Sequence, residues 1–338
     1  MALKISEIAK MAEVSPATVS RVLNHFPNVN EQTRQKVMDV IKKNDYHPSA
    51  IAKSLKAKQT NTICLMLPSI QNMAYAPITK GVEDVAREKG YTVILCNTNG
   101  DEETENQYFD KMKSRMADGF VITSAMPNHQ HIFNLVAEQT PVVLCSRYYP
   151  EDVNKIEICS INNHDASYAL ISEMIRHGYR KIAIALGNEE IFYTTERLRG
   201  YKDALKDAGL TFDESLVMHF ERENRDFYRK TLELIDSGKE FDSIFCTSDT
   251  KAIYAMRAIY ERGLNVPGDI GVFGFDNIDI ADAVIPPLTT VSQSPYQEGR
   301  LAGQCIIEQI EYKRKHGVLP PPRFHEIKPE LIIRKSSK

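Results

Sequence analysis

The sequence of 338 residues has no long apolar run, and this absence excludes one large class of proteins. A helix that spans a membrane needs roughly 18 or more mostly apolar residues in succession, and no run of that length occurs. The opening segment, MALKISEIAKMAEVS, also lacks the apolar block of an export signal, because charged residues interrupt it. We therefore expect a protein that is neither inserted in a membrane nor exported.

Cysteines are few, and their spacing is not that of a disulfide framework. The six lie far apart, mostly inside apolar runs such as TICLMLP, TVILC and PVVLC, and no two are spaced as in CxxC. This pattern predicts buried, reduced thiols. Together with the missing export signal, it predicts a cytoplasmic protein.

Motifs of the common enzyme classes are missing as well. There is no GxSxG, HExxH, Walker loop or GxGxxG, and the glycines of GVFGFD lie at the end of an expected strand. His129 and His131 suggest a metal only weakly, and we expect both to be solvated in a polar loop. The acidic run Asp101–Glu103 is expected to begin a helix, where carboxylates favour the helix dipole. The sequence thus predicts no enzyme, no cofactor and no metal site.

What the chain does have is a charge asymmetry. Residues 1–60 carry ten Lys or Arg and five Asp or Glu, a net charge of +5. The other 278 residues carry 32 basic and 40 acidic side chains, a net charge of −8. A basic segment on an acidic body is typical of a protein whose first part meets phosphates, although many solvated helical segments reach the same charge.

The hydrophobic pattern changes near residue 60. Before it, the spacing predicts only helices, at about Ile5–Ala12, Pro16–Asn24, Glu31–Asn44 and Ala50–Ala57, with Asn30 as the N-cap of the third. After it, apolar runs alternate with amphipathic helices. The expected strands are Thr62–Leu67, Tyr91–Cys96, Gly119–Thr123, Pro141–Cys145, Lys181–Leu186, Ser243–Thr247 and Ile270–Gly274. This alternation favours parallel sheets covered on both faces, and the length favours two α/β lobes with a ligand site between them.

The stretch VSPATVSRVLN follows a first short helix after a tight turn. Apolar stripes on the two helices face each other, which fits a helix-turn-helix unit whose second helix enters the major groove of DNA. The same spacing fits a small helical bundle with a solvated polar face. From the spacing alone, both interpretations stay open.

Four separated motifs resemble those of the LacI/GalR family of bacterial transcriptional regulators, in order and in spacing. They are SPATVSRVLN, PNVNEQTRQKV, NDYHPSAIAKSLKAKQTNTICLMLP and VPGDIGVFGFDNIDIADAVIPPLTTVSQ. The resemblance runs from about Leu3 to Arg334 and is nearest to catabolite-control and sugar-operon regulators of Gram-positive bacteria. It implies a small all-α helix-turn-helix headpiece at 1–46, a hinge helix at 47–60, and an α/β core at 61–338. The core would have two doubly wound parallel-sheet lobes, as in type I periplasmic binding proteins, at about 61–161 with 293–325 and 162–292 with 326–338.

The resemblance also implies which residues contact DNA. In the recognition helix, Pro16 and Ala17 offer only apolar contacts, which leaves Arg21 as the main candidate for reading guanine. The matching phosphate-contacting positions are Ser15, Thr18, Ser20, Asn24 and Thr33. In the hinge, Leu55 supported by Ala52 would wedge into the minor groove, the alternative being a linker leucine packed on the core.

Two headpiece positions depart from the family pattern. Lys4 stands where a threonine usually caps the first helix, and its side chain cannot accept the free helix N–H groups. Glu13 stands where the turn often has glycine, so a non-glycine residue with positive φ is expected there. We expect both to weaken the headpiece locally.

In the core, the resemblance implies a sugar or sugar phosphate as effector. Its expected contacts are Arg197 and Asp276, then Ser248, Asp249 and Arg147, and more weakly Asn72 and Tyr75. Each of these side chains, taken alone, could equally be a surface charge or an ion pair. Asn162 stands where the family often has Asp, and Phe220 competes with Arg222 for a stacking position, so the identity of the effector stays open.

The function that follows is a dimeric repressor of carbohydrate-metabolism genes that binds a palindromic double-stranded operator and responds to the effector. A phosphocarrier protein is an open candidate for a further partner. One alternative is a solute-binding protein of the same fold, against which the basic head and the missing export signal argue. Another is a sugar-modifying enzyme, which the absence of an activated nucleophile or a metal set disfavours.

Overall fold

The computed structural model describes residues 3–338 apart from 25, 47–58, 116, 125 and 220–222. The chain divides into two compact units, Met1–Thr60 and Asn61–Lys338. The first unit is helical and contains α1 (Ile5–Met11), α2 (Pro16–Leu23) and α3 (Glu31–Lys43). The helix expected at Ala50–Ala57 lies outside the described residues.

The three helices of the first unit pack around a small apolar core. Its fully buried members are Ile8, Ala9, Ala12, Val19, Val22 and Val37. The Ser15 hydroxyl accepts the Thr18 N–H at the start of α2, and Asn30 Oδ1 accepts the Gln32 N–H at the start of α3. The predicted Asn30 cap is therefore confirmed.

Lys4 and Glu13, the two residues that depart from the family pattern, have the local structure expected of them. Each also makes a contact that offsets the expected loss of stability. The Lys4 side chain makes no cap, but its backbone N–H donates to the Glu7 carboxylate at 2.6 Å. Glu13 has a φ of 51° and forms a 2.6 Å ion pair with Lys36 of α3. These contacts oppose the local weakening that the two substitutions imply.

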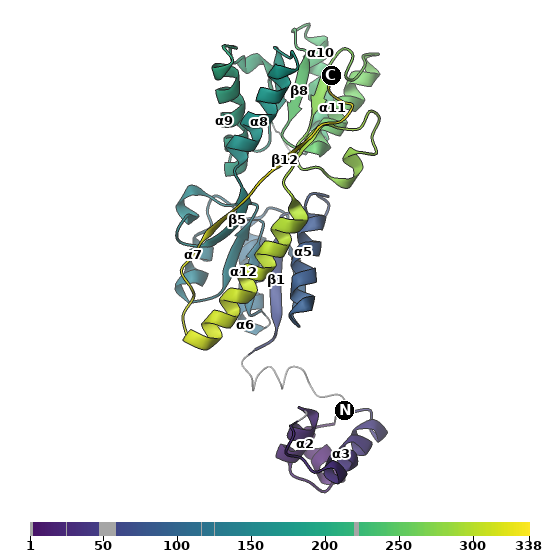
Figure 1. The fold of residues 1–338 in the computed structure, drawn as a ribbon, viewed down its shortest axis with the longest axis vertical. Coiled ribbons are helices and arrows are strands. Elements are labelled where there is room, and N and C mark those ends of the chain that lie inside the picture. Colours follow the sequence, from purple (N-terminus) through teal and green to yellow (C-terminus); the bar gives the residue numbers. More distant parts are fainter. Residues whose placement is uncertain (1–2, 25, 47–58, 116, 125, 220–222) are drawn as a thin grey trace. The chain divides into compact units, whose positions relative to one another are not determined.

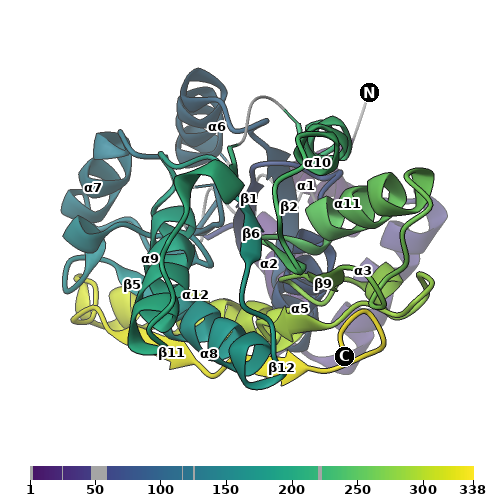
Figure 2. The ribbon, with the colours of Figure 1, turned by 90° about the horizontal axis from the view of Figure 1, so that it is seen from above.

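The second unit, the core, contains two parallel sheets (Figures 1 and 2). The sheet of the first lobe has six strands in the order β11-β5-β4-β3-β1-β2. These strands are β1 (Thr62–Leu67), β2 (Thr92–Asn97), β3 (Gly119–Ile122), β4 (Val142–Cys145), β5 (Glu157–Ile161) and β11 (Phe324–Ile327). The helices of this lobe are α5 (Tyr75–Glu88), α6 (Glu102–Arg115), α7 (Gln130–Ala137) and α12 (Pro295–His316).

The second lobe has a four-stranded parallel sheet in the order β7-β6-β8-β9. Its strands are β6 (Ile182–Ala185), β7 (Val217–Met218), β8 (Ser243–Cys246) and β9 (Gly271–Phe273). Beside them, β10 (Thr290–Ser292) pairs antiparallel with β12 (Glu330–Ile332). The helices are α8 (Asn163–Arg176), α9 (Phe192–Asp207), α10 (Asp226–Asp236) and α11 (Asp249–Glu261). The chain therefore passes between the lobes three times, after β5, after β10 and after β11.

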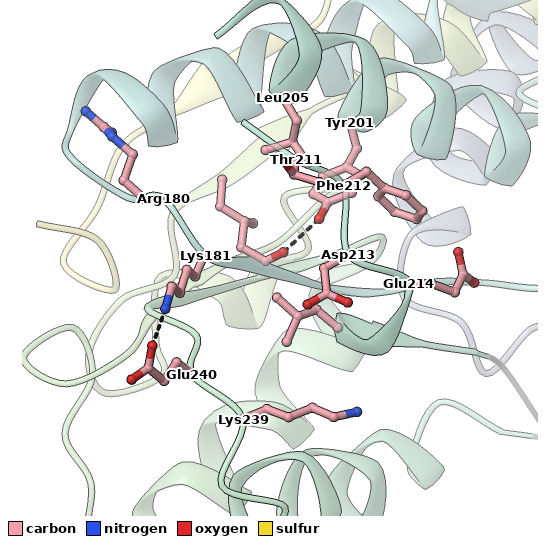
Figure 3. Close-up of a pocket in the computed structure, with 12 residues that line it drawn as sticks. Arg180, Lys181, Tyr201, Leu205, Thr211, Phe212, Asp213, Glu214, Lys239 and Glu240 are labelled. Carbon is pink, nitrogen blue, oxygen red and sulfur yellow. Dashed lines mark hydrogen bonds and ion pairs between the residues drawn. The ribbon is translucent and has the colours of Figure 1, made fainter. Parts of the chain in front are cut away.

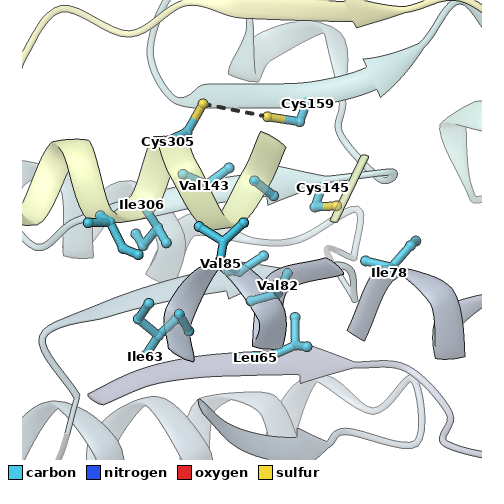
Figure 4. Packing of buried hydrophobic residues seen from close by; sticks show 14 of the residues in the cluster. Ile63, Leu65, Ile78, Val82, Val85, Val143, Cys145, Cys159, Cys305 and Ile306 are labelled. Atoms are coloured by element: carbon cyan, nitrogen blue, oxygen red, sulfur yellow. Dashed lines mark hydrogen bonds between the residues drawn. The ribbon is translucent and has the colours of Figure 1, made fainter. Parts of the chain in front are cut away.

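Each sheet is covered by helices on both faces, because its strands are apolar on both sides. In β1, Ile63 and Leu65 pack toward α5 and α12 (Figure 4), whereas Cys64 and Met66 pack toward α6 and α7. In the second lobe, α10 and α11 cover one face and α8 and α9 the other. All six cysteines are buried and unbridged, as predicted, and no described helix is long and apolar enough to cross a membrane.

All seven expected strands are present, with their ends shifted by one residue at most. The sequence did not reveal β5, because Glu157 and Ser160 interrupt its apolar pattern even though both are buried. It also did not reveal α7, α10 and α12 as helices, nor the short strands β7, β10, β11 and β12. The acidic run at Asp101 does begin a helix, α6, as expected.

Glycines let α5 and α12 touch backbone to backbone. A Cβ atom added at Gly81 of α5 would lie 2.3 Å from the Tyr296 carbonyl oxygen, and one at Gly299 of α12 would lie 2.1 Å from that of Ile78. Both distances are far below van der Waals contact, so any side chain at either position would force the helices apart. Interior packing tolerates such a shift poorly.

We expect Gly81→Ala to lower the free energy of unfolding of the core by about 1–3 kcal/mol, because the added methyl group overpacks this contact. Urea unfolding followed by circular dichroism measures the change. Gly268→Ala is the matched control, since a Cβ there would meet only Asn265 at an ordinary 3.5 Å. Equal effects of the two substitutions would contradict the close contact.

Candidate functional sites

The outer face of α2 presents the residues predicted to meet DNA. Ser15, Pro16, Ala17, Arg21 and Asn24 are exposed, and Thr18, Ser20 and Thr33 are half-buried. Val19 and Val22 are buried on the opposite face of the same helix. Among the described residues, the Arg21 guanidinium has no hydrogen-bond or ion-pair partner, so its donors are available to a ligand.

Several of the polar groups on this face also hold the headpiece together. The Ser15 and Thr18 hydroxyls are 2.9 Å apart, and Asn24 Nδ2 donates to the Ser20 carbonyl at 2.8 Å. The Arg34 guanidinium donates to the Phe26 carbonyl and so fixes the loop after α2. The predicted hinge contacts, Ala52 and Leu55, lie outside the described residues.

In the core, five polar or aromatic side chains from the two lobes gather in what we call the interlobe cluster. It consists of Tyr75, Arg147, Tyr193, Arg197 and Asp276. Tyr75 and Arg147 belong to the first lobe, at the start of α5 and after β4. The other three belong to the second lobe, at the start of α9 and after β9. The carboxyl ends of parallel strands are where ligands of such sheets bind.

Arg197 is the centre of the cluster and is only 4% exposed. Its Nε donates to Asn163 Oδ1 at 2.8 Å, and its Nη1 donates to the Thr247 carbonyl at 2.7 Å. The guanidinium lies 3.5 Å from the centroid of the Phe275 ring, and Nη1 lies 3.8 Å from Asp276 Oδ1. Burial lowers the pKa of Arg197, while the Asp276 charge opposes this shift.

Arg147 enters the cluster from the first lobe. Its guanidinium faces the Tyr75 hydroxyl and lies 5.6 Å from the Tyr193 ring centroid. Within the part of the chain that the structure describes, its buried Nε atom has no hydrogen-bond partner, and neither has the buried hydroxyl of nearby Tyr149. Burial raises the pKa of Tyr75 to about 12, so that this phenol stays protonated. Buried polar atoms without partners are rare and mark a place where a ligand or water is needed.

Asp276 has a φ of 117°, a backbone conformation that residues other than glycine rarely adopt. Gln293 Nε2 donates to its Oδ1 at 2.7 Å. Burial raises the pKa of this carboxyl to about 6, with Arg197 and Lys251 opposing the shift. Lys251, which the sequence did not single out, is 6% exposed, and burial lowers the pKa of its ammonium to about 8.

Asp249 and Ser248 form hydrogen bonds within the protein that support the interlobe cluster. Asp249 is fully buried, and its two carboxylate oxygens accept from the Thr290 hydroxyl at 2.5 Å and from the Ile278 N–H at 2.9 Å. It thereby fixes the loop that carries Asp276. The Ser248 side chain caps α11 and accepts from the Lys251 ammonium at 3.2 Å.

Some of the remaining residues were predicted as site residues, and others were not singled out from the sequence. The Asn72 side chain accepts the Ala74 N–H ahead of α5, and Asn162 caps α8 by accepting the Asp165 N–H. Phe220 and Arg222 lie outside the described residues. Tyr193 and Asn163, which sequence reasoning missed, carry no motif of their own and are recognised only through their contacts with Arg147 and Arg197.

The expectation that His129 and His131 are solvated is wrong. His129 is 2% exposed, with Nε2 at 2.6 Å from Asp152 Oδ1 and Nδ1 at 2.6 Å from the Met126 carbonyl. His131 Nε2 lies 3.0 Å from Glu105 Oε1. Burial opposes the charged form of His129, but the Asp152 carboxylate outweighs it and raises the pKa of the ring. Because α7 packs on the sheet here, both rings are drawn inward.

A surface hollow of the core lies away from the interlobe cluster. It has a volume of about 690 Å³ and lies beside the amino end of β6 (Figure 3). Its lining mixes both charge signs, including the ion pair of Lys181 with Glu240. Its other charged side chains include Arg180 and Lys239, which donate to backbone carbonyls, and Asp213, which accepts the Ser215 N–H.

Comparison with known proteins decides the family. A model described as "Bacterial regulatory proteins, lacI family" matches residues 4–49, and one described as "Periplasmic binding proteins and sugar binding domain of LacI family" matches residues 60–328. The chain belongs to the LacI family. It is 36% identical to the HTH-type transcriptional regulator RegA of Clostridium acetobutylicum and 32% identical to catabolite control protein A of Priestia megaterium, each over 92% of this chain and 93% of the relative.

A solved structure of a transcriptional regulator, CelR, in complex with cellobiose is 25% identical, with a TM-score of 0.75 over 99% of both chains. The predicted fold class is thus confirmed. As a LacI-family member, the chain is a DNA-binding transcriptional regulator and not an enzyme.

At the start of α12, Glu298 is 1% exposed, and its Oε2 has no hydrogen-bond partner among the residues that the structure describes. Burial raises the pKa of this carboxyl to about 8, although the Ser146 N–H opposes the shift. The folded protein therefore holds a proton here that the unfolded chain releases above its ordinary pKa of about 4.3. Stability from this group is present at low pH and is lost as the pH rises toward 8.

We expect Glu298→Gln to remove this pH dependence. Between pH 6 and 8, the unfolding free energy of the wild type should fall relative to the variant by roughly 1 kcal/mol per pH unit. Urea unfolding at both pH values measures it, with Glu311→Gln on the exposed face of the same helix as control. A difference between Glu298→Gln and wild type that does not change with pH would show that Glu298 is ionised in the folded protein.

Proposed function

We propose that this LacI-family regulator is a cytoplasmic homodimeric repressor of carbohydrate-metabolism genes, which binds a palindromic operator and is controlled by a sugar or sugar phosphate. The observation that carries the effector assignment is the interlobe cluster. It brings two guanidinium groups, a carboxylate and tyrosine hydroxyls together at the carboxyl ends of strands from both lobes. Planar charged groups of this kind read hydroxyls and phosphates through paired hydrogen bonds.

For DNA, we propose that α2 lies in the major groove with Arg21 reading a guanine edge. The small, exposed Pro16 and Ala17 would contact bases without hydrogen bonds. Phosphate contacts are assigned to Ser15, Thr18, Ser20, Asn24 and Thr33, whose places on or beside the exposed face of α2 support this. Leu55, with Ala52, is proposed as the minor-groove wedge of the hinge at 47–60.

For the effector, we propose direct contacts from Arg147, Arg197 and Asp276, with Tyr75 beside them. The partnerless Arg147 Nε and Tyr149 hydroxyl support this assignment, since a polyol would satisfy both. The similarity to a regulator solved with cellobiose agrees with a carbohydrate ligand. Asn72, Ser248 and Asp249 are assigned to positioning, because their oxygens already accept hydrogen bonds from the protein.

Control would run from the cluster to the headpiece through lobe closure. An effector that contacts both lobes favours one lobe arrangement, and its differential affinity for the two arrangements supplies the coupling. We assign the headpiece to 1–46, the hinge to 47–60 and the lobes to the ranges expected from the sequence. A phosphocarrier protein stays a candidate co-regulator, as in the catabolite-control branch that the sequence resembles.

We expect Arg21→Ala to cost about 1–3 kcal/mol of discrimination between the operator and a variant operator, because the paired contact to guanine is lost. The operator is found by random-site selection with the full chain, and binding is followed by fluorescence anisotropy at several salt concentrations. Arg176→Ala, an exposed arginine of α8, removes the same charge outside the headpiece and serves as control. Failure of the wild type to select any site would overturn the repressor proposal, and unchanged discrimination in Arg21→Ala would overturn the role of Arg21.

We expect Arg197→Lys to weaken effector binding by at least tenfold, because lysine keeps the charge but not the planar fork. A thermal-shift panel of sugars and sugar phosphates first identifies a compound that stabilises the wild type, and calorimetry then compares the variants. The control is Arg199→Lys, an exposed arginine two residues further along α9 that pairs with Glu196. Equal affinities of the two variants would remove Arg197 from the effector site.

A further inference from the structure

Three side chains that are far apart in the sequence meet at one edge of the first lobe. Glu157 of β5, Cys305 of α12 and His325 of β11 place their ligand atoms within 4.8 Å of one another. His325 Nε2 lies 2.7 Å from Glu157 Oε1 and 3.5 Å from Cys305 Sγ. We call these three residues the edge triad. The spacing of these three residues along the sequence does not predict that they meet.

The fold itself brings the triad together. β11 pairs in parallel with β5, with Phe324 opposite Ile158 and His325 opposite Cys159, so His325 lies beside this strand. α12 crosses the same strand and brings Cys305 over it, where Cys305 Sγ lies 3.9 Å from Cys159 Sγ (Figure 4). Glu157 and Cys305 are 2% and 3% exposed, whereas the His325 side chain is 23% exposed. The triad is therefore buried on two sides and open to solvent through its histidine.

These three ligand types and their separations fit a thiophilic divalent cation. Zinc binds thiolate sulfur at about 2.3 Å and imidazole nitrogen or carboxylate oxygen at about 2.0–2.2 Å, in a tetrahedron. Such bond lengths place a sulfur and a nitrogen ligand roughly 3.6 Å apart and a nitrogen and an oxygen ligand roughly 3.4 Å apart. The Cys305–His325 distance already has this value, and the His325–Glu157 hydrogen bond has to open by less than 1 Å.

We propose that the edge triad is a binding site for Zn²⁺, with Cys305 Sγ, His325 Nε2 and Glu157 Oε1 as ligands and a water molecule in the fourth position. Binding replaces the hydrogen bonds within the triad by three metal–ligand bonds. The Cys305 thiol releases its proton to solvent, and His325 binds in its neutral form, so affinity rises with pH. Cys159, whose Sγ lies 3.9 Å from Cys305 Sγ, is not one of the three ligands.

One positive charge faces the site and has to be accommodated. Arg323 Nη2 lies 3.3 Å from Glu157 Oε1, and its backbone N–H donates to Glu157 Oε2 at 2.9 Å. The same Nη2 lies 3.2 Å from Glu308 Oε2, and the Arg323 side chain is 57% exposed. The guanidinium is thus free to keep Glu308 and leave Glu157 Oε1 to the metal. The backbone contact meanwhile holds the other carboxylate oxygen and orients the ligand, as outer-shell hydrogen bonds do in metal sites.

The position of the triad gives the metal a structural role. β11 is a four-residue edge strand in which no residue is fully buried. It lies between α12 and the last crossing into the second lobe, so a cation bound by β5, α12 and β11 together would clamp this strand to the sheet. The clamp adds stability by the usual linkage, because the unfolded chain does not hold the three ligands together.

Cobalt substitution tests the proposal, because tetrahedral Co²⁺ bound by a thiolate has visible d–d bands and a near-ultraviolet charge-transfer band. The full chain, reduced and freed of metal with a chelator, is titrated with Co²⁺ and then with Zn²⁺ in competition. We expect one Co²⁺ per chain with both spectral features, displacement by Zn²⁺, and a rise in melting temperature on Zn²⁺ addition.

Cys305→Ser and His325→Gln should each remove the charge-transfer band or weaken Zn²⁺ binding by at least tenfold. Cys246→Ser is the matched control, a buried thiol of the second lobe that should leave the site intact. If Cys305→Ser fails to fold, His325→Gln still provides the test, because the His325 side chain is partly exposed. A titration without a thiolate band, or the same binding in His325→Gln as in wild type, would overturn the site.

Discussion

The burial of the Arg197 guanidinium is the constraint on which the core's functional geometry depends. A charge removed from water has to be matched by partners, and here Asn163, the Thr247 carbonyl and the Phe275 ring provide them from three different elements. The side chain therefore fixes the start of α8, the end of β8 and the loop after β9 relative to one another. Arg147, by contrast, has a buried Nε atom with no hydrogen-bond partner among the described residues, so the first lobe's half of the cluster is less fully paired.

The core combines close helix packing inside the first lobe with less complete polar contacts between the lobes. At Gly81 and Gly299 the backbones of α5 and α12 touch, so this contact leaves no room for a side chain. The polar groups between the lobes are fewer, and several are strained or unpaired, as at Asp276 and Tyr149. A change of lobe arrangement therefore breaks contacts more readily between the lobes than between α5 and α12.

A strand or a site residue could be predicted from the sequence only where its residue types are typical of its environment in the fold. The strand Thr62–Leu67 was predictable because every side chain in it is apolar, whereas β5 was hidden by Glu157, a carboxylate that the fold buries against His325 and Arg323. Arg197 and Asp276 were candidates because charged side chains near strand ends suit a ligand site, and the resemblance to a family raised them above Arg147 and Asp249. Lys251 was missed because a lysine within a helix ordinarily marks a solvent face, and only the tertiary structure turns it inward.

The three crossings between the lobes also bear on how the protein is made. Two elements late in the chain complete both lobes: β11 forms the edge of the first sheet, and the fully buried Ser336 accepts the Val272 N–H beside the second. Neither lobe can be finished while residues beyond 320 are still inside the ribosome. Residues 324–336 therefore contribute to both lobes, and neither lobe has all of its native contacts until this segment has been synthesised.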